Sequence, residues 1–195
     1  MIILEGIKFK LIFEKQALNG VCVITPELFK DQRGYFFESF KQADIKKKLN
    51  KDFLQDNEVL SRNCNIIRGL HYQIDNPQGK LIHVVFGAIK DIIVDVRIGS
   101  PNFGKSFAIT LTSKNHKMLY VPEGFAHGYL VLVENTIVHY KCTNYYDSKS
   151  EYGIKWNDPD INIDWGISEP ILSEKDKNLP FLKMPSSIYQ KDSMT

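Results

Sequence analysis

Short segments in which apolar residues alternate with polar ones recur along this chain and constrain its fold more than any other feature. Residues 66–97, IIRGLHYQIDNPQGKLIHVVFGAIKDIIVDVR, contain several, separated by turn residues such as Asn76, Gly79 and Gly87. Apolar residues at every second position are typical of strands with one buried face. Many short strands at this spacing predict an all-β sandwich or barrel. Strands are expected at residues 21–26, 34–40, 66–73, 80–86, 91–97, 106–112, 128–134 and 136–142.

Helical patterns are confined to two short segments. One is QADIKKKLN, residues 42–50. The other follows Ser173, which is a suitable N-cap for a helix with Asp176 at its third position. The remainder of the chain is therefore expected to be strands and turns.

The length and the N-terminal pattern bear on domain organisation. At 195 residues the chain has the length of one ordinary domain, and no linker or repeat divides it. The alternating Ile7, Phe9, Leu11 and Phe13 predict an N-terminal strand that joins its own sheet or a partner subunit's. We expect a single domain over residues 1–195, made of an N-terminal strand region at 1–20, a core at 21–145 and a C-terminal segment at 146–195.

Composition excludes several classes of protein. The formal net charge is +2, which is too balanced for a protein that holds nucleic acid by neutralising phosphates. The three cysteines are an odd number and lack Cys-x-x-Cys spacing, so neither a disulfide framework nor a structural zinc site is expected. Glu5, Lys8 and Lys10 interrupt the apolar N-terminus, which excludes a signal peptide or membrane span there. We expect a soluble, cytoplasmic protein that binds neither nucleic acid nor membrane.

His71 is the histidine that most suggests a functional site. In a regular strand His71 and Gln73 share a polar inner face, while their immediate neighbours point the other way. Position alone favours a histidine satisfied by one hydrogen bond in the core. Arg68 should face away from His71, unless Gly69 introduces a bulge that turns the arginine toward it.

A second group of candidates lies in VPEGFAHGYLVLVENTIVHYKCTNYY, residues 121–146. His127 stands between two small residues, which leaves room for a ligand or for another strand. Tyr140, Tyr145 and Tyr146 follow, and packing is the expected role of at least one of these tyrosines.

The motifs that are absent narrow the chemistry. A metal site on such a strand needs two histidines one residue apart, but Gln73 stands where the second would be, so no metal is expected. There is also no phosphate-binding loop, nucleophile elbow or nicotinamide fingerprint. The remaining histidines, tyrosines, lysines and aspartates are suited to proton abstraction next to a carbonyl. Arginines and aromatic side chains are suited to an anionic, ring-bearing ligand.

The chain strongly resembles the dTDP-4-dehydrorhamnose 3,5-epimerase family from about residue 20 to about residue 180. The motifs that carry the resemblance, in order, are DQRGYFFESF, IIRGLHYQ, QGKLIHVVFGAIKDIIVDVR, SPNFG, VPEGFAHGY, YKCTNYY and WNDPDINIDW. The resemblance implies a cupin jelly roll that forms a homodimer by exchanging N-terminal strands and needs no cofactor. It also implies a nucleoside-diphosphate 4-keto-6-deoxy sugar as substrate, on the way to a surface polysaccharide. The C4 carbonyl of such a sugar acidifies the hydrogens on C3 and C5.

The same resemblance assigns catalytic roles. His71 corresponds to the general base, and Asp176 to the acid that orients it. Tyr140 corresponds to the group that returns a proton from the other face, and Lys80 to a cation for the enolate oxygen at C4. Arg68, Asp91 and His127 correspond to residues that line the cavity, although Asp91 is equally suited to pair with Arg68 or Lys80.

Nucleotide contacts are also implied. Residues that resemble the base and diphosphate contacts are Phe29, Arg33, Glu38, Gln55 and Asn57. An arginine matches a diphosphate by forked hydrogen bonds, and an aromatic ring stacks on a base. Tyr145 or Tyr146 is expected to close over that end of the substrate.

One segment departs from the family pattern. After QDN the family usually has a His or Trp and then serines, whereas this chain has Glu58, Val59 and Leu60. Because these positions lie near the substrate in the family, Glu58 is a further candidate contact, and a GDP-linked sugar or a heptose becomes an alternative substrate. A ketoisomerase that moves the carbonyl within the ring and a non-catalytic sugar-nucleotide-binding cupin are the alternative functions. Tyr140 favours epimerisation over the ketoisomerase. The presence together of His71, Asp176, Tyr140 and Lys80 disfavours the non-catalytic alternative.

Overall fold

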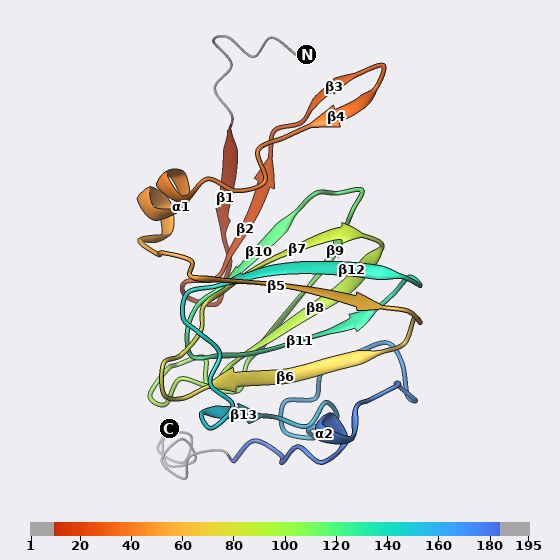
Figure 1. Ribbon diagram of the computed structural model, residues 1–195. Coiled ribbons are helices and arrows are strands. Elements are labelled where there is room, and N and C mark those ends of the chain that lie inside the picture. Colours follow the sequence, from red (N-terminus) through yellow and green to blue (C-terminus); the bar gives the residue numbers. More distant parts are fainter. Residues whose placement is uncertain (1–9, 184–195) are drawn as a thin grey trace, which may run out of the picture.

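A computed structural model of the chain describes residues 10–183, and most of its regular secondary structure is antiparallel strand (Figure 1). The strands are β1 (Leu11–Lys15), β2 (Cys22–Pro26), β3 (Phe29–Asp31), β4 (Gly34–Phe36), β5 (Gln55–Ser61), β6 (Ile67–Gln73), β7 (Lys80–Phe86), β8 (Ala88–Asp95), β9 (Ser106–Thr112), β10 (Met118–Val121), β11 (Phe125–Val131), β12 (Thr136–Cys142) and β13 (Glu151–Gly153). The helices are α1 (Gln42–Leu49) and α2 (Glu174–Lys177). No helix within residues 10–183 is long and apolar enough to cross a membrane.

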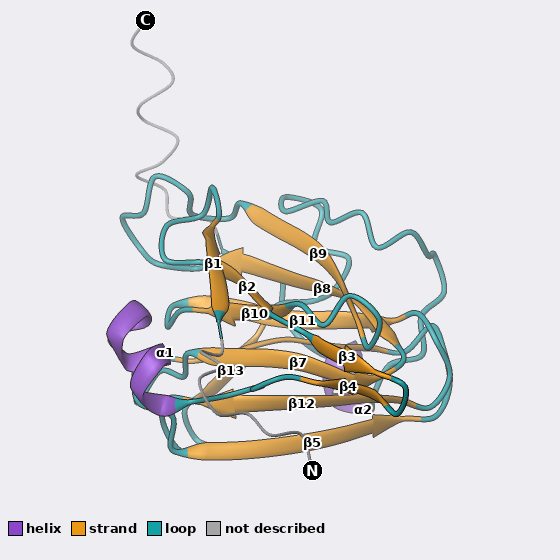
Figure 2. Ribbon diagram, turned by 90° about the horizontal axis from the view of Figure 1, so that it is seen from above, coloured by secondary structure: helices purple, strands orange, loops and turns teal. Residues whose placement is uncertain are grey.

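Two large sheets face each other. One has six strands in the order β1-β2-β10-β7-β12-β5, and the other has five in the order β13-β6-β11-β8-β9. Strands β3 and β4 form a separate hairpin that projects from the body, and α1 lies beside the six-stranded sheet (Figures 1 and 2). This arrangement confirms the predicted all-β jelly roll.

Apolar side chains fill the space between the sheets at one end. Ile82 and Val138 of the six-stranded sheet pack with Ile93 and Val131 of the five-stranded sheet, and all four are 0% exposed. Each such side chain contributes about 1.5–3 kcal/mol by its burial. Further apolar clusters cover the outer faces, where α1 packs on the six-stranded sheet and the C-terminal segment on the five-stranded one. This packing fixes the distance between the two sheets. The inner faces of the same sheets also carry the polar residues described below.

The sequence located some strands closely and missed others. Strands β7, β9 and β12 have the predicted bounds, whereas β8 and β11 each begin three residues earlier than predicted. Their mutual ladder, from Phe125 opposite Asp95 to Val131 opposite Ile89, sets both starts. Strands β3, β5, β10 and β13 were not predicted. In β5 the inward and outward positions are both largely polar, so hydrophobic periodicity could not reveal it.

The N-terminal prediction is tested only in part. Leu11 and Phe13 lie on β1 and pack on the apolar cluster beneath α1, as their alternation predicts. Ile7 and Phe9 lie outside the described residues. In this single chain β1 pairs with its own β2 and forms one edge of the six-stranded sheet.

Candidate active site

Two adjoining cavities lie between the sheets and share three lining residues, His71, Lys80 and Tyr140. The first cavity, of about 290 Å³, is also lined by Gln55, Asn57, Tyr72, Gln73, Gln78, Tyr146 and Glu151. The second cavity, of about 230 Å³, is also lined by Val59, Arg68, His127, Tyr129, Ser173, Lys175 and Asp176. The shared residues therefore stand where the two cavities meet.

His71 and Asp176 form a hydrogen-bonded pair, although 105 residues separate them. His71 lies on β6, and its Nε2 is 2.7 Å from Asp176 Oδ1 on α2. Ser173 caps α2 by accepting a bond from the Asp176 backbone N–H at 3.1 Å, which fixes the helix start as predicted. Burial would raise the pKa of Asp176, but bonds from His71 and Ser173 outweigh it and lower this pKa below the usual value. Asp176 is therefore a carboxylate that holds the imidazole in one orientation.

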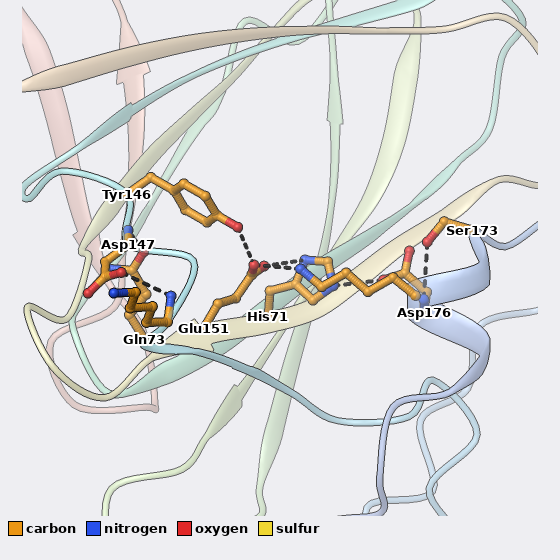
Figure 3. Close-up of polar contacts among 9 residues, drawn as sticks. His71, Gln73, Tyr146, Asp147, Glu151, Ser173 and Asp176 are labelled. Carbon is orange, nitrogen blue, oxygen red and sulfur yellow. Dashed lines mark hydrogen bonds and ion pairs between the residues drawn. The ribbon is translucent and has the colours of Figure 1, made fainter.

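Glu151 lies on the other side of the His71 ring (Figure 3). Its Oε1 is 3.6 Å from His71 Nδ1, which is too long for a hydrogen bond. Its Oε2 accepts bonds of 2.5 Å from the Tyr146 hydroxyl and from Lys175 Nζ. Burial raises the pKa of Glu151, but the bonds from Lys175 and Tyr146 lower it overall. With Nε2 bonded to Asp176, Nδ1 is the ring nitrogen left free to take a proton.

Lys80 and Tyr140 come from the opposite wall, on β7 and β12 of the six-stranded sheet. Lys80 Nζ has neither a hydrogen bond nor an ion pair with any residue in 10–183. Burial lowers the pKa of Lys80 below its ordinary value. Burial raises the pKa of Tyr140, which keeps its hydroxyl protonated. The site therefore places a side chain that can accept a proton on one wall, and a lysine and a side chain that can donate a proton on the other.

Gly69 turns Arg68 into the same space as His71. Gly69 has a φ of +105°, and the pairing of β6 with β11 shifts register beside it. A Cβ at this glycine would lie 2.5 Å from the His127 carbonyl oxygen, so only glycine fits. The bulge considered from the sequence is confirmed, and Arg68 lines the second cavity with His71.

Asp91 has a different role from the one expected. It is 0% exposed on β8 and lines neither cavity. Its two carboxylate oxygens are 3.1 and 3.0 Å from His127 Nε2. Asp91 therefore orients His127, and it pairs with neither Arg68 nor Lys80.

Some of the expected nucleotide contacts gather at the first cavity. Gln55 Nε2 donates to Asn57 Oδ1 at 3.0 Å, and the Tyr146 backbone N–H donates to Gln55 Oε1 at 2.9 Å. Tyr146 lines this cavity, whereas Tyr145 is 67% exposed and lines neither. Of the two tyrosines expected to close over the substrate, the structure therefore places Tyr146 at the cavity.

Four other candidates lie away from both cavities of their own chain. Glu58 is on the outward face of β5, opposite His139, while Val59 faces inward. Strand alternation sends adjacent side chains to opposite faces, which explains why Glu58 points away from both cavities. The others, Phe29, Arg33 and Glu38, belong to the β3–β4 hairpin and the segment after it. At the hairpin tip Arg33 bonds Asp31 instead.

Two residues that sequence reasoning missed complete the site, Glu151 and Lys175. Neither residue lies in a segment of alternating apolar and polar residues, and β13 is only three residues long. No local sequence pattern therefore identifies these two residues as part of a site. Within residues 10–183 no group of three or more His, Cys, Asp or Glu side chains is arranged to hold a metal ion. The groups that meet here are suited to transferring protons.

Comparisons with known proteins identify the family. The family model described as dTDP-4-dehydrorhamnose 3,5-epimerase matches residues 15–184. The protein of that name from Methanothermobacter thermautotrophicus is 44% identical over 85% of this chain and 91% of its own length.

Solved structures agree. A dTDP-4-dehydrorhamnose 3,5-epimerase from Bacillus anthracis, with TDP and PPi bound, is 42% identical with a TM-score of 0.84, and the match covers 90% of this chain and 100% of that one. A dTDP-6-deoxy-D-glucose-3,5-epimerase from Legionella pneumophila, in complex with dTDP-4-keto-L-rhamnose, is 37% identical with a TM-score of 0.83, and the match covers 89% and 93%. By its sequence and by its cupin jelly roll, this chain belongs to the dTDP-4-dehydrorhamnose 3,5-epimerase family of isomerases.

Proposed function

We propose that this chain inverts both C3 and C5 of dTDP-4-keto-6-deoxyglucose. The observation that carries the proposal is the placement of His71 and Tyr140 on opposing sheets, with Lys80 beside Tyr140 and without an ion-pair partner in residues 10–183. Inversion needs an acceptor on one face of the sugar and a donor on the other. The ligands named for the Bacillus anthracis and Legionella pneumophila structures support a dTDP-linked substrate over a GDP-linked one.

The first step removes a proton. His71 Nδ1 takes the hydrogen from C3 or C5, and the C–H electron pair moves toward C4 to form an enolate. Asp176, bonded to Nε2, fixes the tautomer that leaves Nδ1 unprotonated and stabilises the imidazolium that results. Lys80 places its charge at the enolate oxygen, where negative charge develops.

The second step returns a proton from the other wall. The Tyr140 hydroxyl donates to the same carbon on the opposite face, which inverts it and restores the carbonyl. Because burial raises the pKa of Tyr140, its hydroxyl is protonated before the reaction begins. Exchange with water then removes the proton from His71 and restores the Tyr140 hydroxyl, so that the second carbon can react.

We further propose that the enzyme acts as a homodimer. Phe29, Arg33 and Glu38 line neither cavity of their own chain, yet they match nucleotide contacts of the family. The β3–β4 hairpin projects from the body with Arg33 exposed near its tip (Figure 1). A partner subunit's hairpin would bring these side chains to the first cavity, beside Gln55 and Asn57.

Proton NMR in deuterated water tests the reaction. The enzyme is incubated with dTDP-4-keto-6-deoxyglucose and, separately, with its GDP-linked counterpart. We expect deuterium at C3 and C5, with inversion at both, only in the dTDP-linked sugar. Deuterium at C3 alone would make the enzyme a single-site epimerase, and a carbonyl moved to C3 would make it a ketoisomerase. Binding without exchange of either sugar would leave a non-catalytic binding protein.

A further inference from the structure

Arg68 lines the second cavity, where it is accessible to solvent, and it bonds a neutral group. Its Nε donates to Ser61 Oγ at 3.2 Å, and no carboxylate within residues 10–183 forms an ion pair with it. The two terminal nitrogens of the guanidinium have no hydrogen-bond partner in that part of the chain. Because no counter-ion neutralises it, the charge of this guanidinium is available to an anionic ligand.

Ser61 is built into the wall behind Arg68. It is the last residue of β5, is 1% exposed, and pairs with the fully buried Thr136 on β12. A side chain so short and so buried has little freedom, so its hydroxyl has a fixed position. A buried hydroxyl that accepts a charge-assisted bond restricts the long arginine side chain to one of its many rotamers.

Tyr129 keeps the surroundings of this bond neutral. It stands opposite Arg68 in the ladder between β11 and β6 and is 4% exposed. Burial raises the pKa of Tyr129 above its ordinary value, and Arg68 and Ser61 offset only part of that increase. Tyr129 therefore remains an uncharged phenol beside the guanidinium. The neighbouring carboxylate of Asp91 is directed to His127 instead.

We propose that Ser61 is a positioning residue for substrate binding. It fixes the Arg68 guanidinium through Nε, so that both terminal nitrogens face the second cavity and bind negatively charged substrate oxygen. A carboxylate in place of Ser61 would fix the arginine equally well but would neutralise it. This inference rests on the proposed function, because it requires an anionic substrate in the second cavity.

Steady-state kinetics of a double-mutant cycle test the inference. We expect Ser61→Ala to raise KM for dTDP-4-keto-6-deoxyglucose about tenfold with little change in kcat, since a bond to a charged group is lost. Ser61→Thr retains the hydroxyl, so its KM should lie close to that of the wild-type enzyme. In an Arg68→Gln background, Ser61→Ala should have no further effect on KM, because residues that act through one another are not additive.

Ser100→Ala is the matched control. Ser100 Oγ also bonds a charged side chain, Asp95 at 2.7 Å, but it lines neither cavity. Ser100→Ala should leave KM unchanged. Should Ser61→Ala behave like Ser100→Ala, or should its effect add fully to that of Arg68→Gln, Ser61 would be structural only. Inactive wild-type enzyme would instead contradict the proposed function, and melting temperatures would reveal any variant that fails to fold.

Discussion

Two charged groups in this molecule, one buried and one only partly exposed, differ in whether the protein supplies a counter-charge. Asp95, at the end of β8, is 0% exposed and is bonded by Arg97 at 2.6 Å and by Ser100 at 2.7 Å. Lys80, between the sheets, has no such partner within residues 10–183. A buried charge with partners maintains structure, whereas a buried charge without one costs stability. The difference supports the proposal that the partner of Lys80 is the negative charge that forms on the substrate.

Replacing Lys80 should produce the largest effect. Lys80→Met keeps the length of the side chain and removes the charge. We expect kcat to fall about 10²–10³-fold, as when one stabilising donor of an oxyanion is removed. Because burial lowers the pKa of Lys80, its charge destabilises the folded state at neutral pH, so the melting temperature should rise. A Lys80→Met protein that melts at a lower temperature would show that the ammonium has a structural partner.

Replacing Asp95 should have the opposite pattern. Asp95→Asn leaves Arg97 without its counter-charge, and we expect the free energy of unfolding to fall by about 3 kcal/mol. Activity per folded molecule should be unchanged, because neither residue lines a cavity. Urea unfolding and an assay at saturating substrate measure the two quantities. A loss of kcat without loss of stability would contradict the structural role assigned to Asp95.

Acid should reduce the stability that Asp95 contributes, gradually and by a smaller amount. The folded-state pKa of Asp95 is lowered overall, since the bonds from Arg97 and Ser100 outweigh the effect of burial. Stability from this carboxylate is therefore complete above its unfolded pKa of about 4 and is lost as pH falls through the lower folded value. The difference in unfolding free energy between wild type and Asp95→Asn should shrink below about pH 4. Urea titrations at several pH values would show a constant difference if the pKa were not lowered.

An ion pair with an exposed carboxylate should give the smallest effect. Lys141 Nζ lies 2.8 Å from Asp56 Oδ2 on the outer face of the six-stranded sheet, where the Asp56 side chain is 54% exposed. Asp56→Asn should change the free energy of unfolding by about 1 kcal/mol or less, and less still at high salt. A change as large as that in Asp95→Asn would mean that the exposure of the carboxylate does not determine how much an ion pair contributes to stability.

The sequence predicted regular strands better than it predicted what meets between them. Period-two runs identified β7 and β12, which carry Lys80 and Tyr140, because one face of each strand packs on apolar core. Strand β5, which carries Ser61, has polar residues on both faces and was not recognised. Helix α2 was predicted from the Ser173 cap, but only its packing on β6 brings Asp176 to His71.

Other parts of the site depend on backbone geometry that no local pattern records. Arg68 reaches the cavity because Gly69 has a positive φ and the ladder shifts register beside it. Glu151 reaches His71 because β13 pairs with the end of β6. Glu58 points away from the cavities of its own chain, because its outward direction follows from the register of β5 on β12.

The central claim is that protons leave and return from opposite walls of the cavity. It is tested most directly by following deuterium incorporation and inversion of dTDP-4-keto-6-deoxyglucose separately in two variants, by NMR in deuterated water. In Tyr140→Phe we expect exchange to continue while inversion falls about 10²-fold or more, and in His71→Asn we expect both to be lost. Exchange that persists in His71→Asn, or exchange and inversion that fall equally in Tyr140→Phe, would contradict the account.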